Sequence, residues 1–260
     1  MDELSHWLHI TYSPDSNAED RRKAYEYTNY IKSQSAECFK LSMEILAFRE
    51  ADTILLHFGI HCAEHIVTSG WNYMNDDEKI YLKNTIITIV KDCYKYQNAK
   101  KYIYEDVAKL AVAIALREWP HNWNNFHEEL LSCVNHDNNI NEYQSCRMVL
   151  SIIRNLCDKM NDYTPNLPDK RKNEVKNALT NTINTHFFNF FIITFKKYIT
   201  ILTNGNNSNE IIDIINLILE TFTSFAGWID PTIFYNHNIL SLCLPLFLNI
   251  KTCAKLQNSW

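Results

Sequence analysis

The chain has 260 residues, of which 46% are hydrophobic and 21% are charged, so it can bury a substantial core and is not disordered by composition. Its net charge of −5 lacks the basic excess of proteins built mainly to neutralise nucleic-acid phosphates. Four glycines and six prolines are too few for the many turns of an all-β or α/β fold, so the composition predicts an all-α protein.

Apolar residues recur at helical spacing along the first half of the chain. We predict helices at about 2–12, 18–34, 37–48, 51–68, 76–92 and 101–118. Ser16 or Asn17 is expected to cap the second of them, and the acids that follow Asn75 complement the dipole of the fifth. These segments predict a continuous series of amphipathic helices.

The second half continues the same pattern with stronger breaks. We predict helices at about 124–134, 141–160, 170–202, 211–225 and 231–248. Two prolines lie in the break at 164–169, a polar linker fills 203–209, and Pro245 kinks or shortens the last helix. The count is eleven or twelve helices in all.

The helix at 51–68 has two chemically distinct faces. Its apolar face contains Leu55, Phe58, Cys62 and Ile66. The polar stripe, defined as His57, His61, Glu64 and Thr68, follows at spacings of four, three and four residues. This pattern predicts a helix that buries one face and presents the stripe to a partner or to solvent.

Histidines at 57, 61 and 65 also raise the alternative of a metal site, since residues four apart can share one ion. The acid of an HExxH motif is missing, no cysteine cluster lies nearby in the sequence, and successive i+4 positions drift around the helix. We therefore predict no metal site and no cofactor.

The stretch around Trp119, Pro120 and Trp123 predicts a sharp corner between two helices. Proline lacks an N–H and disfavours helical geometry in the residue before it, so the helix from 101 ends there. Two large rings four residues apart are suited to holding the next helix at a fixed angle. The corner is interpreted as structural.

Lys170, Arg171 and Lys172 begin the helix at 170–202. Cations in a first helical turn oppose the helix dipole, so this basic cluster is the best local candidate for an acidic partner or a phosphate. A solvated helix end without a ligand is the alternative.

Paired amphipathic helices at a period near 40 residues predict an α-solenoid of about six HEAT- or ARM-like pairs. Because the repeats share no obvious sequence identity, a non-repetitive helical bundle remains an alternative. Phosphate-binding loops, nucleophile elbows and catalytic Cys/His sets are missing from the sequence, which indicates a binding protein and not an enzyme.

The surroundings of the protein are also indicated by its composition. The eight cysteines are scattered without a Cys-x-x-Cys pair, which is typical of buried thiols in a reducing compartment. The N-terminus lacks a signal-peptide pattern, and the most apolar segment, 187–202, is interrupted by Asn189, Lys196 and Lys197. We expect an intracellular protein without a membrane span.

Five segments, taken in order and spacing, carry a resemblance to a known family: 56–67 with Trp71, 81–84, 117–123, 167–172 and 226–230. Together they resemble the N-terminal portion of the nuclear exportins, within the karyopherin-β (importin-β) superfamily. Within that group the similarity is greatest to the branch that exports double-stranded RNA.

The resemblance implies a right-handed superhelix of HEAT repeats, divided into importin-β N-terminal-like repeats at 1–98 and exportin-1-like repeats at 99–260. It also implies a receptor that shuttles between nucleus and cytoplasm, with Ran-GTP, double-stranded or hairpin RNA such as microRNA precursors, and nucleoporins as partners. Second helices of repeat pairs face Ran in this family, so the polar stripe is the candidate Ran-binding surface. The basic cluster is the candidate RNA-binding surface.

A second class of function stays open at this point. The same solenoid surface could act as a protein–protein scaffold that does not depend on Ran. GTP-selective binding of Ran distinguishes the two.

Overall fold

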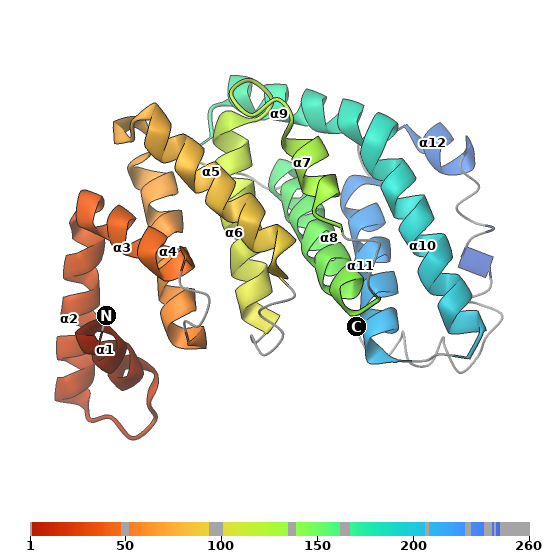
Figure 1. The fold of residues 1–260 in the computed structure, drawn as a ribbon. Helices are drawn as coiled ribbons and strands as arrows, with labels where there is room; N and C mark the ends of the chain where they lie inside the picture. The colour runs from red at the N-terminus through yellow and green to blue at the C-terminus, as the bar shows by residue number, and fades with distance from the viewer. Residues whose placement is uncertain are drawn as a thin grey trace. The chain divides into compact units, whose positions relative to one another are not determined.

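The computed structural model describes residues 2–47, 52–93, 101–134, 139–161, 167–205, 208–226, 230–236, 241 and 243–244. Regular secondary structure in those residues is helical throughout (Figure 1). The predicted all-α fold is confirmed. The chain forms two compact units, Met1–Arg117 and Glu118–Trp260, which are described separately below as unit 1 and unit 2.

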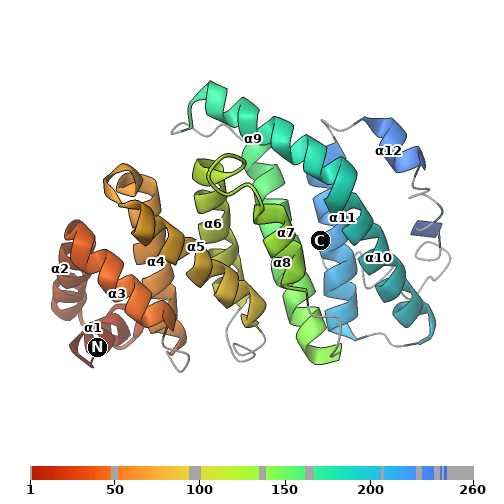
Figure 2. The same ribbon diagram turned by 45° about the horizontal axis from the view of Figure 1, so that its top comes forward.

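Unit 1 is built from consecutive packed helices (Figure 2). They are α1 (Asp2–Tyr12), α2 (Ala18–Ser33), α3 (Ser35–Ala47), α4 (Thr53–Ser69), the 3₁₀ turn η1 (Trp71–Tyr73), α5 (Asp76–Lys91) and α6 (Lys101–Glu118). Helix α3 packs along α4, and α1 packs against both α2 and α4. Helix α3 also contacts α5. Pairs of neighbouring helices that contact the next pair confirm the predicted paired arrangement.

Local side-chain contacts fix where the helices of unit 1 begin. The Asn17 side chain accepts a hydrogen bond from the Asp20 N–H at 2.8 Å, so the predicted cap of α2 is this asparagine. At the start of α5, Asn75 and Glu78 bond each other's backbone N–H groups at 2.9 Å, which is a capping box. Each cap satisfies N–H groups that have no partner within the helix, at a gain of about 1 kcal/mol.

Unit 2 contains a second set of packed helices. They are α7 (Phe126–Ser132), α8 (Asn139–Asn161), α9 (Asp169–Thr182), the π-helical turn η3 (Ile183–Phe187), α10 (Phe188–Thr203), α11 (Asn209–Ala226) and α12 (Pro231–Asn236). Helix α11 packs against both α8 and α10. Phe222 of α11 is surrounded by rings of α10, with centroids 5.6–6.2 Å from those of Phe188, Phe191 and Phe195. This aromatic cluster is part of the core of unit 2.

Two helices of unit 2 differ from the sequence-based prediction. The segment 170–202 is interrupted by η3, whose wider turn allows Ile183, Phe187 and Phe188 all to be buried. Helix α7 begins at Phe126 and not at 124, because turns that follow Pro120 occupy the residues before it. The predicted helix 231–248 is described only in part, and Pro245 with the tail to 260 lies outside the described residues.

Further expectations concern the thiols, the membrane and the domains. Of the seven cysteines that the structure describes, six are buried, at 38, 62, 93, 133, 146 and 157, and no disulfide joins the seven. Among the described helices, none combines the length and the apolar composition that a bilayer crossing requires. The domain boundary at 98/99 and the handedness of the superhelix stay predictions.

Candidate functional site

Helix α4 is fixed in unit 1 by its N-terminal cap, by a close contact with α3 and by its apolar face. The Asp52 carboxylate caps it by accepting hydrogen bonds from the N–H groups of Ile54 and Leu55 at 2.7 and 3.0 Å. Gly59 lies against Ile45 of α3, where a Cβ would come within 2.6 Å of Ile45 Cγ2. This glycine therefore permits the close approach of the two helices. The apolar face predicted from the sequence is buried, including Leu55, Phe58, Cys62 and Ile66.

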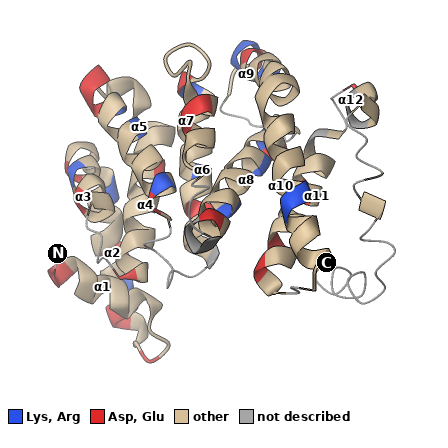
Figure 3. Ribbon diagram, turned by 45° about the vertical axis from the view of Figure 1, so that its right-hand side comes forward, with Lys and Arg blue, Asp and Glu red and all other residues tan. Residues whose placement is uncertain are grey.

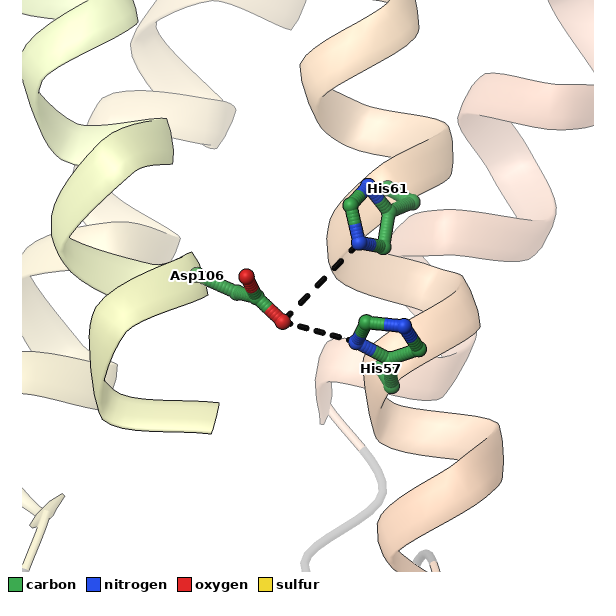
Figure 4. A group of neighbouring side chains, drawn as sticks. All are labelled: His57, His61 and Asp106. Carbon is green, nitrogen blue, oxygen red and sulfur yellow. Dashed lines mark hydrogen bonds and ion pairs between the residues drawn. The ribbon is translucent and has the colours of Figure 1, made fainter. Parts of the chain in front are cut away.

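The polar stripe meets α6 through a buried carboxylate (Figure 4). His57 Nδ1 lies 2.7 Å from Asp106 Oδ2, which is a hydrogen bond, and His61 Nε2 lies 3.9 Å from the same oxygen. The Asp106 side chain is only 7% exposed, against 22% for His57 and 37% for His61. Two imidazoles one helical turn apart thus converge on one carboxylate from the neighbouring helix.

Two tyrosine rings and the Lys109 ammonium lie beside this cluster. The Tyr102 and Tyr12 rings stand edge-on to His57, with centroids 5.1 and 6.1 Å away. Burial, followed by the nearby Tyr102 and the charge of Asp106, raises the pKa of Tyr12, so its phenol stays neutral at physiological pH. Lys109 Nζ lies 3.5 Å from Asp106 Oδ1.

The C-terminal end of the stripe is tied to α6 through the backbone. The Thr68 hydroxyl donates to the backbone carbonyls of Glu64 and His65 at 2.8 and 2.9 Å. The Thr68 carbonyl accepts a hydrogen bond from Arg117 Nη2 at 3.1 Å. Burial lowers the pKa of the Arg117 guanidinium, although arginine stays charged at any physiological pH.

The structure divides the stripe into a half-buried part and an open part. His57 belongs to the contact between α4 and α6, whereas Thr68 is exposed and Glu64 is one-third exposed. His57 is therefore partly covered by its contact with α6, and the assignment of the stripe to Ran stays a prediction. Sequence reasoning missed Asp106, whose only local signal is a charge directly before the apolar run that starts at Val107.

The basic cluster begins α9, where Figure 3 shows its cations in blue. Lys170 is exposed and Lys172 is half-buried. Arg171 is 16% exposed, donates a hydrogen bond to the Trp119 carbonyl and pairs with Glu174 at 3.3 Å. Arg171 therefore holds the start of α9 against the corner. Of the three residues, Lys170 is the one best placed for an anionic partner.

The corner predicted around Pro120 is densely packed. Trp119 and Trp123 are 1% and 4% exposed, and their ring centroids lie 5.9 and 4.7 Å from that of Phe126. The Trp123 Nε1–H donates to Glu129 at 2.9 Å, and the Glu118 carbonyl accepts hydrogen bonds from two N–H groups of the turn. The Trp119–Pro120 peptide bond is cis.

Known proteins resemble this chain along most of its length. Residues 100–258 match the family model described as exportin 1-like protein. Exportin-5 of Dictyostelium discoideum is 22% identical over 96% of the chain, and exportin-5 of Mus musculus is 24% identical over 88% of it. Protein MSN5 of Saccharomyces cerevisiae is 30% identical over 56% of the chain. The chain covers 22%, 19% and 12% of these relatives respectively, so it spans about a fifth of the length of the two exportins.

Proposed function

The chain belongs to the exportin 1-like protein family, and from this membership we propose that it is part of a nuclear transport receptor that binds Ran in its GTP form. The cargo we propose is double-stranded or hairpin RNA, carried from nucleus to cytoplasm. The observation that carries the proposal is the similarity to exportin-5 across 96% of the chain. The receptor acts by binding alone: Ran-GTP and cargo bind together in the nucleus and separate after GTP hydrolysis in the cytoplasm.

The open part of the polar stripe is the surface proposed for Ran. Helices α4 and α6 are the second members of their pairs and contact each other through the stripe. Glu64 and Thr68 offer charge and a polar surface beside Lys109, whose side chain is half exposed. Such a mixed polar surface on a fixed pair of helices supports a protein partner of matching charge.

The test measures whether Ran binds in a GTP-dependent manner. The purified chain is mixed with Ran loaded with a nonhydrolysable GTP analogue or with GDP, and the affinity of each is determined. We expect the GTP form to bind selectively, and Glu64→Arg with Thr68→Arg to weaken it about tenfold, or about 1.4 kcal/mol. Cations near the end of α4 complement its dipole, so its stability should hardly change.

A matched control carries the same change of charge on the other helix of the pair. Glu44→Arg with Ala47→Arg alters two exposed positions of α3 and should leave Ran binding unchanged. Equal losses in both double variants would mean that charge alone, and not the stripe, controls binding. If the parent chain binds the GTP and GDP forms of Ran with equal affinity, the alternative function is favoured, namely a scaffold that does not depend on Ran.

The RNA contact is proposed for Lys170 with Lys172. Charge reversal of both should weaken binding to a duplex RNA stem irrespective of sequence, because phosphate contacts carry no sequence information. Each lost phosphate contact should reduce the slope of log K against log salt by about 0.7–0.9. Fluorescence anisotropy over a salt series measures this slope.

The control for RNA binding is Lys159→Glu with Lys196→Glu, two exposed lysines of α8 and α10. This variant has the same net charge as the double variant in α9 and should keep the parent slope. Arg171 is left in place, since its removal would disturb the Trp119 corner. An unchanged slope after reversal of Lys170 and Lys172 would place the RNA elsewhere.

A further inference from the structure

Three side chains of unit 1 form a set of donors suited to a metal ion. They are His57 and His61 of α4 and Asp106 of α6, and one ligand atom from each lies within 4.8 Å of the others. The carboxylate is almost completely buried, and the two imidazoles approach it from one side (Figure 4). Two imidazoles and a carboxylate are ligands that zinc and its neighbours among the divalent transition metals accept.

The distances bracket those that a tetrahedral ion needs. Ligand atoms about 2.0–2.1 Å from zinc stand about 3.3 Å apart. Asp106 Oδ2 lies 2.7 Å from His57 Nδ1 and 3.9 Å from His61 Nε2. These two distances lie on either side of that spacing, and all three ligand atoms lie within 4.8 Å of one another, so small side-chain rotations would bring them around one ion.

A second carboxylate orients His61 toward the cluster. Glu64 Oε2 lies 3.4 Å from His61 Nδ1, on the side of the ring opposite the nitrogen that faces Asp106. A ligating histidine commonly donates its other N–H to such a carboxylate, which keeps the ligating nitrogen unprotonated and in position. The Tyr12 and Tyr102 rings stand edge-on to the neighbouring ligand His57.

A hydrogen bond between His57 and Asp106 explains only part of this arrangement. At 3.9 Å, His61 Nε2 is beyond hydrogen-bonding distance of Asp106, and yet it faces the same oxygen. An ion between the three groups accounts for both rings. The sequence-based search considered His65 as the third ligand, but that side chain is exposed and lies beside Ser69.

We propose that His57, His61 and Asp106 bind one divalent ion of the zinc class, with a fourth position open to water. The ion links α4 to α6 and so fixes the surface that carries Glu64 and Thr68. This inference goes beyond the proposed transport function. Its test uses the chain alone, so failure of Ran or RNA binding does not affect the result.

Titration of the purified, untagged chain with Co²⁺, followed by its d–d absorption, tests the site. We expect one equivalent to bind with a tetrahedral spectrum, and Zn²⁺ to displace it and raise the melting temperature. His57→Gln, His61→Gln and Asp106→Asn should each weaken binding by more than the roughly 10- to 100-fold that loss of an outer-shell partner costs. Glu64→Gln should weaken it about tenfold.

The matched control is His65→Gln, which removes a histidine from the same helix but outside the cluster and should leave Co²⁺ binding unchanged. Equal loss in this variant, or no stoichiometric binding by the parent chain, would overturn the proposal. A thiolate-to-cobalt charge-transfer band would place the ion on cysteines and would overturn it too. If Asp106→Asn loses its helical circular dichroism, His61→Gln, at a more exposed position, decides the matter.

Discussion

Trp119→Ala should lower the free energy of unfolding by about 3–5 kcal/mol, because it empties a fully buried site against Phe126. The loss includes the transfer free energy of the indole and the cost of a cavity that the corner cannot close. The Trp119 carbonyl also accepts the hydrogen bond from Arg171, so a collapsed corner would release the start of α9. Circular dichroism followed through a thermal melt should show a decrease of about 10 °C or more.

Two further variants separate the packing of this ring from the general loss of an aromatic residue. Trp119→Phe retains part of the buried surface and should cost less than half as much. Tyr73→Ala removes a ring that is 91% exposed and should change stability by no more than about 0.5 kcal/mol. A melting temperature of Trp119→Ala within about 2 °C of the parent would show that the ring does not hold the corner.

The helices could be predicted from the sequence where short-range chemistry determines them. The capping box of α5 needs only Asn75 and Glu78, which are three residues apart, and both of its groups are visible in the sequence. The end of α6 before Pro120 follows in the same way from the geometry of proline. The turn η3 could not be predicted, since its register depends on how Phe187 and Phe188 pack in the core.

The candidate site was predictable on one side only. Helical periodicity placed His57 and His61 on the same face of α4, but Asp106 lies 49 residues from His57 and its only local signal is a charge before an apolar run. The basic cluster shows the same limit. Arg171 lies between two lysines, and the local sequence does not distinguish its role from theirs. Yet it donates a hydrogen bond to the Trp119 carbonyl, 52 residues away in the chain. Tertiary contacts therefore decide which member of a local motif is structural and which is open to a partner.

A second large effect on stability is expected at the ion pair between Glu142 of α8 and Lys197 of α10. The Glu142 side chain is 4% exposed and that of Lys197 is 40% exposed, so the pair joins a buried anion to a cation at the surface. The surroundings are weakly polar: burial, and then the charge of Glu142, raises the pKa of the Cys146 thiol to about 12. Burial likewise raises the pKa of Tyr198, with Cys146 and Glu142 adding to the effect.

Lys197→Met should therefore lower the free energy of unfolding by about 2–3 kcal/mol, because it removes the Lys197 cation from beside the buried Glu142 carboxylate. The cost is below the roughly 3–5 kcal/mol of a fully buried pair, since water can reach the site once the exposed lysine is gone. Glu142→Met combined with Lys197→Met should recover most of the loss, as apolar replacement of a buried pair is often neutral. Lys196→Met, at the exposed neighbouring position, should have little effect in the same denaturant titration. If Lys197→Met and Lys196→Met unfold at the same denaturant concentration, the ion pair contributes nothing to the free energy of unfolding. The packing of α8 against α11 would then stabilise this part of unit 2 without it.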